Sequence, residues 1–333
     1  MLLWACPAAG QTVVDDAAME ELRQRAPAGA NDDRTIDQWL AGLLTQLSGA
    51  SDTASATRGF METLTRVRDD QATTQAFRDA LATRLGVIAE SELGKGDKLP
   101  AHTAEALLHA LRAADHPGAI PGLLAALSFP RESVRYFGAA GLMSLRDRIA
   151  NDQSRMNGVI AAVAAAGEKE NSAVVVERLY RACSFDGAPA SAIDAIAGIL
   201  SVRVERYRQG AALADSAEPA AFDYLAQSRA APAQAAAIVR SLAVLLRLDV
   251  ERYAAGLFLP GEMSAIEVRL DACESLIESL CGCTGGNVRG ECQAGGPGAG
   301  IKMQLELDKW IGSAGQSRGV LNPAPWNVTP GAP

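Results

Sequence analysis

The chain has few of the features that strands, membrane spans and nucleic-acid binding need. Aromatic side chains make up 5% of its 333 residues, and β-branched and aromatic runs are scarce while alanine is abundant, so we expect a nearly all-α protein. No apolar run approaches the roughly 18 residues of a membrane-spanning helix. Asp and Glu (39) outnumber Lys and Arg (31), giving a formal net charge of −8. This balance argues against a nucleic acid as partner, because phosphate binding depends on Lys and Arg.

Motifs of catalysis and cofactor binding are also scarce. The sequence has three histidines and contains no G-x-S-x-G, H-E-x-x-H or dinucleotide-binding pattern. The loop 94–98 lacks the spacing of a phosphate-binding loop and has no apolar strand before it, so it predicts a turn. No cofactor is expected, and an enzyme becomes less probable, although residues brought together by folding can still catalyse a reaction.

Residues 117–149 predict two antiparallel helices joined by a tight turn. Pro117 suits the first turn of a helix, and apolar residues then recur at helical spacing until Pro130, which disfavours the helical conformation at the residue before it. A second helix begins near Glu132 and has an apolar face of its own, made of Val134, Phe137, Ala140, Gly141, Met143 and Leu145. Such a pair cannot bury both stripes alone, so neighbouring pairs are expected.

This segment resembles a HEAT repeat over about a tenth of the chain. The resemblance rests on a short first helix, a turn proline, a Val-Arg opening and small residues in the second helix, namely Pro121, Leu123, Leu124, Leu127, Pro130, Val134, Arg135, Ala139, Ala140 and Leu142. A matching interval of 36 residues separates Leu124, Ile160 and Ile196, and also Leu127, Val163 and Ile199. The resemblance implies an α-solenoid of antiparallel helix pairs, a fold that presents an extended binding surface.

The predicted organisation has five parts. Residues 1–12 resemble a remnant of an export signal, 13–100 form N-terminal helices, 101–258 form the HEAT-like array, 259–311 hold a C-terminal helix and a Cys/Gly-rich segment, and 312–333 form an extended tail. Outside residues 117–149, helices are expected over 35–47, 57–67, 74–93, 101–114, 157–166, 172–183, 190–208, 218–228 and 233–257. Residues 284–300 are expected to be a flexible hairpin or linker, and 302–311 suit either a helix or a short strand. Roughly ten to twelve helices are expected in all.

The first candidate function is a non-enzymatic scaffold that binds another protein, whose identity the sequence does not give. The alternative is a lyase-type enzyme or a small-ligand binder that uses the concave groove, because HEAT-like arrays also occur in proteins that resemble the phycobilin lyases. Glu105, His109 and Tyr136 are the nearest candidates for such a groove.

Two clusters of side chains suggest surface sites. His102 and His109 lie seven residues apart, with Glu105 between them, on the helix predicted over 101–114, and His116 continues the spacing. Seven residues span about 10 Å along a helix, so one metal ion cannot bridge these histidines, and a solvated helix face is the plainer interpretation. The second cluster consists of arginines that serve either as solvated residues between repeats or as an anion or partner contact: Arg131, Arg135, Arg146 and Arg148.

Cysteines suggest the most distinctive chemistry. Cys273, Cys281, Cys283 and Cys292 fall within twenty residues. They can close two disulfides, bind zinc as thiolates or remain free thiols, although the C-x-C spacing differs from a zinc knuckle. Cys183 is expected to be a small core residue.

The first twelve residues suggest in which compartment of the cell the protein resides. They are apolar and then small, which resembles the end of an export signal without its basic residue, and Leu3 to Cys6 resemble a weak lipoprotein box. We therefore expect the bacterial periplasm or envelope, with the cytoplasm as the alternative, and membrane attachment only if Cys6 is lipidated.

Overall fold

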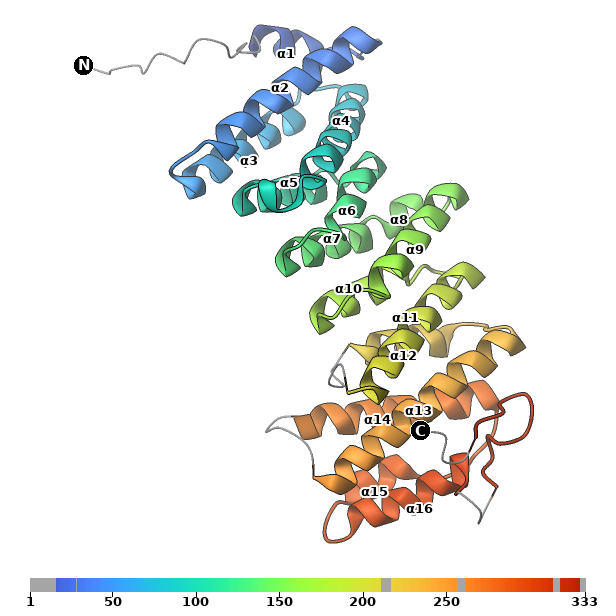
Figure 1. Cartoon of the computed structure of the whole chain (residues 1–333). Helices are drawn as coiled ribbons and strands as arrows, with labels where there is room; N and C mark the ends of the chain where they lie inside the picture. Colours follow the sequence, from blue (N-terminus) through green and yellow to red (C-terminus); the bar gives the residue numbers. More distant parts are fainter. Residues whose placement is uncertain (1–15, 28, 211–216, 257–261, 314–317, 330–333) are drawn as a thin grey trace. The chain divides into compact units, whose positions relative to one another are not determined.

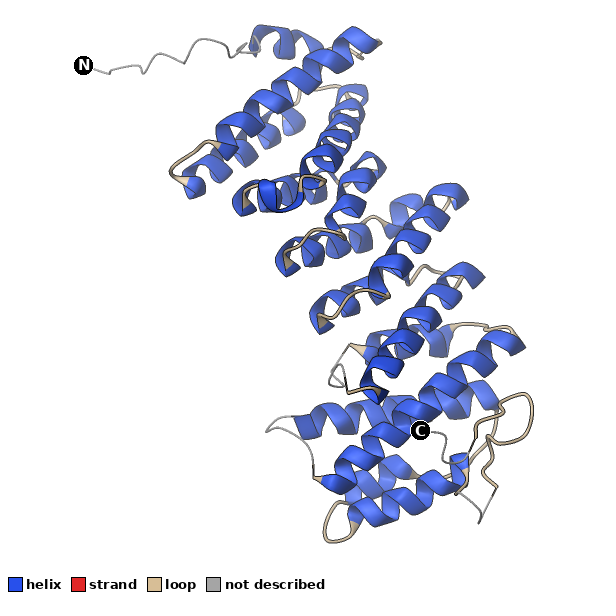
Figure 2. Ribbon diagram, viewed as in Figure 1, coloured by secondary structure: helices blue, strands red, loops and turns tan. Residues whose placement is uncertain are grey.

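The computed structural model describes residues 16–27, 29–210, 217–256, 262–313 and 318–329. Every extended regular element within these ranges is a helix and none is a β-strand (Figure 2), which confirms the all-α prediction. The predicted export remnant, Cys6 included, lies outside the described residues. Within the described ranges, none of the helices is long and apolar enough to span a membrane.

The chain divides into two units at residues 153 and 154, the start of α9 and a point inside the range predicted as one array. The first unit holds α1 (Asp16–Arg23), α2 (Ala30–Ser48), α3 (Thr53–Asp69), α4 (Gln75–Leu93), α5 (Ala101–Ala114), α6 (Ile120–Ala126), α7 (Glu132–Ser144) and α8 (Arg146–Ile149), with short 3-10 turns η1 (Gly96–Lys98) and η2 (Pro117–Ala119). The second holds α9 (Gln153–Gly167), α10 (Ala173–Cys183), α11 (Ala190–Arg208), α12 (Glu218–Gln227), α13 (Pro232–Ala255), α14 (Glu262–Cys281), α15 (Val288–Ala294) and α16 (Ala299–Ile311). The bounds of α5 and α11 are those that periodicity predicts.

Helices of the first unit pack in two layers. Consecutive helices contact each other in the pairs α2–α3, α4–α5 and α6–α7. Helices two places apart are also in contact from α2 to α7, namely α2–α4, α3–α5, α4–α6 and α5–α7 (Figure 1). The predicted apolar stripes make these contacts: Leu107, Leu108 and Leu111 of α5 are fully buried. Burial of each such side chain contributes about 1.5–3 kcal/mol.

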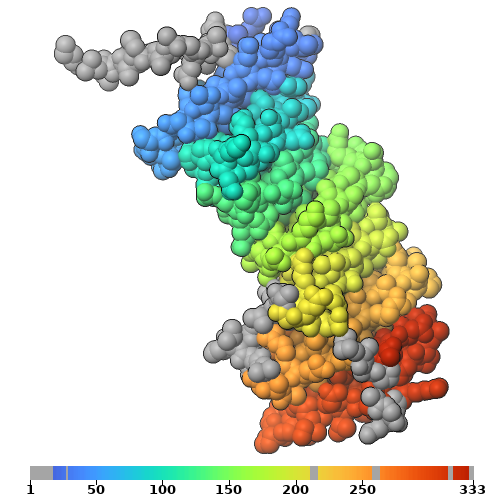
Figure 3. All heavy atoms as spheres, viewed as in Figure 1, coloured from blue at the N-terminus to red at the C-terminus, as the bar shows by residue number. Residues whose placement is uncertain are grey.

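In the second unit the helices also alternate, and a terminal cluster follows. Contacts join α10 to α12, α11 to α13 and α12 to α14, while α15 packs on both α14 and α16. Side chains fill the gaps between the ribbons of each unit (Figure 3). The core of this unit also contains charged side chains, since Arg203, Glu218, Asp249, Arg269 and Glu274 are almost entirely buried.

The glycine-rich segment is more ordered than the sequence predicts. Helix α15 lies within the expected linker, and its N-cap residue Asn287 accepts a hydrogen bond from the backbone N–H of Gly290. A Cβ atom on Gly285 would come within 2.4 Å of the Trp310 ring, so the glycines allow the backbone to lie directly against α16. Residues 302–311 belong to a helix, with Trp310 fully buried.

The prediction of an extended tail is wrong for the part that the structure describes. Residues 318–329 fold back on the second unit, where the backbone N–H of Leu321 donates to the Trp310 carbonyl at 2.9 Å and that of Val328 donates to the Leu321 carbonyl at 2.9 Å. The Asn322 amide closes the turn by donating to the carbonyls of Ile311 and Val328. Leu321 and Val328 are buried, so these two residues anchor the segment.

Candidate binding pocket

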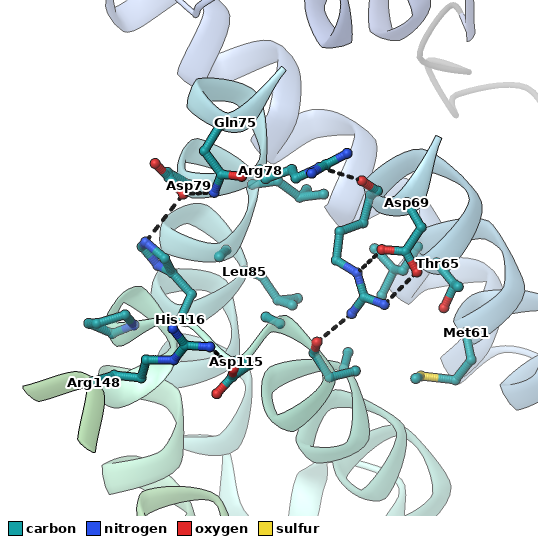
Figure 4. Close-up of a pocket in the computed structure, with 18 residues that line it drawn as sticks. Met61, Thr65, Asp69, Gln75, Arg78, Asp79, Leu85, Asp115, His116 and Arg148 are labelled. Carbon is teal, nitrogen blue, oxygen red and sulfur yellow. Dashed lines mark hydrogen bonds and ion pairs between the residues drawn. The ribbon is translucent and has the colours of Figure 1, made fainter. Parts of the chain in front are cut away.

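A pocket of about 430 Å³ lies in the first unit, between α3, α4, α5 and the turn η2 (Figure 4). We call its apolar lining residues the floor: Met61, Leu64, Leu81, Ala82, Leu85, Ala110, Ala113, Ala114 and Pro117. We call its polar lining residues the rim: Thr65, Arg68, Asp69, Gln75, Arg78, Asp79, Asp115, His116 and Arg148. An apolar floor with a few placed polar groups is the usual construction of a ligand-binding site.

The end of α5 forms one wall of the pocket. Asp115 follows α5 in the left-handed conformation, with φ of 44°, and this residue ends the helix. His116 then accepts a hydrogen bond at Nδ1 from the backbone N–H of Gly118, at 3.0 Å, and opens the turn η2. This turn lies so close to α4 that a Cβ atom on Gly86 would come within 1.9 Å of the Gly118 carbonyl oxygen. Glycine at both positions therefore allows the wall to form.

Arginines fix the opposite side of the rim. Arg68 binds both carboxylate oxygens of Asp69, at 2.6 and 2.7 Å, and also donates to the Ala113 carbonyl, which ties α3 to the end of α5. The guanidinium holds the pKa of the Asp69 carboxyl below its usual value. Arg78 donates to the Arg68 carbonyl at 2.8 Å and to the Asp70 carbonyl at 3.3 Å. The arginines thus hold the rim in place through the backbone.

Two further side-chain pairs lie on the rim: Arg148 with Asp115, and His116 with Asp79 (Figure 4). The guanidinium of Arg148 donates to the Asp115 carboxylate at 2.5 Å, and this hydrogen bond raises the pKa of Arg148. The Nε2 atom of His116 lies 3.6 Å from the Asp79 carboxylate, which also accepts from Gln75 at 2.7 Å. The rim therefore carries both signs of charge, since Arg68, Arg78 and Arg148 lie beside Asp69, Asp79 and Asp115.

The predicted histidine stripe is divided among three environments. His102 Nε2 lies 3.0 Å from the Leu47 carbonyl at the end of α2, and Glu105 accepts a hydrogen bond from Ser133 of α7 at 3.3 Å. His109 is exposed, with its ring centroid 5.1 Å from that of Phe137. His116 falls beyond α5 and lines the pocket. The face does not form one open stripe because α5 is in contact with α2, α3 and α7.

Of the three residues considered for a lyase groove, His109 and Tyr136 both lie beside the ring of Phe137. Tyr136 contacts Phe137 edge to face at 5.4 Å, next to His109. A second, more open hollow is lined by His109 together with Met61, Arg112, Ala113, Asp115 and Ser144. Glu105 and Tyr136 line neither of the two hollows.

The predicted arginine cluster makes local contacts. Arg135 donates to the carbonyls of Phe129 and Pro130, at 3.0 and 2.7 Å, and so stabilises the turn between α6 and α7. Arg146 donates to the Met143 carbonyl at 3.2 Å, whereas Arg131 is exposed at the start of α7. Of this cluster, Arg148 alone is part of the pocket lining.

The four C-terminal cysteines do not form one site. Cys281 and Cys283 are joined by a disulfide, whereas the thiols of Cys273 and Cys292 are free and buried. Cys273 points into the core, where its S–H donates to the Leu242 carbonyl at 3.4 Å. No group of three or more potential ligands in the described ranges is arranged to hold a metal ion. The separation arises because Cys273 lies on the buried face of α14 and Cys281 at the end of that helix.

Cys183 is buried in α10, where the sequence places a core residue. Burial raises the pKa of its thiol to about 12. The pKa of the Cys292 thiol rises to about 11 for the same reason. Neither sulfur is therefore a nucleophile at neutral pH.

Sequence reasoning missed the buried charges of the second unit. Arg269 donates to both carboxylate oxygens of Asp249, at 2.6 and 2.7 Å, with both side chains fully buried. Arg203, Tyr207 and Glu218 form a second hydrogen-bonded group, in which Arg203 Nε lies 2.7 Å from the Glu218 carboxylate. One sequence pattern could have revealed these buried charges, namely a charged residue on an apolar helix face. Arg269 is such a residue, since it lies between the buried Ile266 and Leu270.

No family model, curated protein or solved structure matches this chain.

The lining of the pocket combines apolar side chains with charged and polar ones. Its lining includes no serine or cysteine, and Thr65 is its one hydroxyl side chain. His116 Nε2 and the Asp79 carboxylate are 3.6 Å apart, which is longer than a hydrogen bond in this unliganded structure. The apolar floor can accept a hydrophobic group while the rim pairs with polar groups beside it.

Proposed function

We propose that this protein is a non-enzymatic interaction scaffold whose first unit receives an apolar side chain of a partner protein. The pocket carries this proposal, because its apolar floor lies beneath a rim of side chains that are already oriented by ion pairs and backbone hydrogen bonds. A preorganised rim reduces the entropy lost on binding.

We propose further that the helices form a HEAT-like α-solenoid of antiparallel pairs. The two-layer packing of the first unit supports this, since from α2 to α7 each helix contacts its pair partner and a helix two places away. The residues of α6 and α7 that resemble a HEAT repeat lie next to the wall of the pocket. Such arrays bind extended segments of other proteins along their surfaces.

The rim also suggests the chemistry of the partner. Arg68 and Arg148 are each paired with an aspartate, and both pairs are partly exposed. A segment with an apolar residue flanked by one acidic and one basic residue can exchange these pairs for intermolecular ones. Electrostatic complementarity of this kind contributes to specificity and association rate more than to affinity.

Selection from a random peptide library tests the proposal. The full chain is immobilised, and enriched peptides are measured against Ala113→Trp, which places an indole in the pocket from an exposed position. The matched control is Ala41→Trp, on an exposed position of α2 outside the pocket lining. We expect peptides with one apolar anchor, whose affinity falls at least tenfold with Ala113→Trp and is unchanged with Ala41→Trp. Peptides that bind both variants equally would refute the assignment of the pocket.

A small-ligand binder is the second candidate, and the volume of about 430 Å³ favours it, because pockets for small molecules span roughly 300–1,000 Å³. Thermal-shift screening with amphipathic small molecules distinguishes the two. A stabilisation that Ala113→Trp abolishes, without any peptide enriched in the selection, would replace the scaffold by a small-ligand binder.

We propose an envelope location on the basis of residues 1–12. The intact mass of the protein isolated from its own source tests this, with and without reduction and alkylation. Loss of the first residues supports export, and an unprocessed chain with six reactive thiols supports the cytoplasm.

A further inference from the structure

The disulfide between Cys281 and Cys283 closes an unusually small loop. Cys281 is the last residue of α14, and only Gly282 separates the two cysteines, whose Cα atoms lie 5.2 Å apart. Gly282 is exposed and has φ of 62°, a conformation that glycine adopts without strain. Both cysteines are half-buried, so solvent and a partner molecule can reach this part of the loop.

We expect this disulfide to contribute little to the stability of the folded chain. A disulfide stabilises mainly by shortening the loops of the unfolded chain, and its effect falls as the enclosed loop becomes shorter. Other contacts already join α14 to α15: the buried Glu274 carboxylate accepts the backbone N–H groups of Val288 and Arg289, at 2.9 and 3.0 Å. It also accepts the indole N–H of Trp310 at 2.7 Å. Contacts other than the disulfide therefore also hold α14, α15 and α16 together.

The residues that follow the disulfide in the loop have small side chains, and several of them are exposed to solvent. Gly282, Thr284 and Asn287 are exposed, and Gly285 and Gly286 follow in the same loop. No bulky side chain from this loop covers the sulfurs, so a polypeptide can approach them. In contrast, Cys183, Cys273 and Cys292 are buried. Disulfides that solvent can reach and that add little to the stability of the fold are typically the exchangeable ones.

We propose that Cys281 and Cys283 form a thiol–disulfide exchange site that oxidises a pair of thiols in a partner polypeptide. In the first step a partner thiolate attacks Cys283 Sγ, a mixed disulfide forms, and the bond between the two cysteines breaks. The Cys281 sulfur leaves as a thiolate and takes up a proton. The second partner thiolate then attacks the partner's own sulfur in the mixed disulfide and releases Cys283 as a thiolate. Two electrons pass from the partner dithiol to this disulfide.

Cys281 is the leaving sulfur because the backbone N–H of Cys283 lies 3.2 Å from its Sγ atom. A hydrogen bond to the departing sulfur stabilises the thiolate that forms there. It offsets the unfavourable field at the carboxyl end of α14, which acts against negative charge. In the Cys281→Ser variant the Cys283 thiolate has no second cysteine beside it, so its attack on oxidised glutathione should release one glutathione thiolate and leave a persistent mixed disulfide between Cys283 and glutathione.

The test uses the full chain in glutathione buffers of graded redox poise, with alkylation and intact mass as the readout. We expect one reversible two-electron transition that involves Cys281 and Cys283, while the three buried thiols remain unalkylated without denaturant. A reduced peptide with two cysteines should be oxidised in a one-to-one ratio. Cys281→Ser and Cys283→Ser should abolish this oxidation, and Thr284→Ala, an exposed neighbour, should leave it unchanged.

Three results would overturn the proposal. The first is a bond that survives a hundredfold excess of reduced over oxidised glutathione under native conditions. The second is a marked fall in the urea midpoint of the second unit on reduction, since this would make the disulfide a structural one. The third is air-oxidised protein in which both cysteines are alkylated as free thiols. Exchange with glutathione but not with the dicysteine peptide would also reject the polypeptide as substrate.

Discussion

Replacing Arg269 by methionine should destabilise the second unit strongly. Its guanidinium donates twice to Asp249, and both side chains are fully buried. It also lies close enough to Glu218 and Tyr207 for their charges to affect its pKa. The substitution leaves the buried carboxylate of Asp249 without its hydrogen-bonded guanidinium, while Arg203 remains paired with Glu218. Removal of one partner of a buried ion pair costs about 3–5 kcal/mol.

Amide hydrogen exchange measures this loss in each helix separately, which matters in a chain of two units. A destabilisation of about 3–5 kcal/mol accelerates exchange by roughly two to three and a half orders of magnitude, at about 1.4 kcal/mol per factor of ten. We expect the acceleration in peptides of α13 and α14, which carry Asp249 and Arg269. Exchange in α2 to α5 should be unchanged.

A double variant separates the loss of charge pairing from the loss of packing. Asp249→Leu combined with Arg269→Met removes both charges and keeps similar volume, so exchange should return to the wild-type rate or below it. Arg208→Met is the matched control, because the pair of Arg208 with Glu205 is exposed on α11, and it should have no measurable effect. Unchanged exchange in Arg269→Met would refute the argument, as would a double variant no more stable than the single one.

Three further predictions follow from individual contacts. Gly86→Ala should destabilise the first unit by about 1–3 kcal/mol in urea unfolding, because its Cβ would meet the Gly118 carbonyl. Gly59→Ala on α3 is the control: its Cβ would have no atom within 4 Å, so it should stabilise the unit by about 0.5–1 kcal/mol. The Cys183 thiol has a pKa raised by burial from 9.0 to about 12, so its stabilising effect is complete below pH 9. The stability of the wild type relative to Cys183→Ala should then fall by about 1.4 kcal/mol per pH unit between pH 9 and 12. Asn322→Ala should release residues 318–329, which limited proteolysis would detect as new cleavage; resistance equal to that of the wild type would contradict this.

Periodicity predicted the helices that bury a full stripe. Helices α5 and α11 have the predicted bounds because their apolar residues recur on one face throughout their length. Helix α15 was missed since its stability comes from a distant residue: Glu274 of α14 accepts the first N–H groups of α15. A glycine-rich sequence cannot reveal a partner that lies more than ten residues away. The folded tail was missed for the same reason, as Asn322 binds the carbonyl of Ile311.

The pocket was beyond sequence analysis because its walls come from segments that are far apart in the chain. Arg68 meets the Ala113 carbonyl, and Arg148 meets Asp115, only after α3, α5 and α8 have packed. His116 shows the limit most clearly: heptad spacing placed it with His102 and His109, whereas the left-handed residue Asp115 ends the helix before it.

The placement of charges gives the two units different capacities for binding. In the first unit the rim pairs are partly open to solvent, as Arg148 is 59% exposed and Asp115 is 48% exposed. Water and a partner can both replace such a pair at low cost, since exposed ion pairs contribute little to stability. In the second unit Arg269 and Asp249 are 0% exposed, and separating them would leave uncompensated charge in the core. Exchange of ion pairs with a partner is therefore feasible at the pocket of the first unit. In the second unit the buried pairs instead fix the arrangement of α11 to α14. The disulfide loop follows directly on α14, the last of these helices.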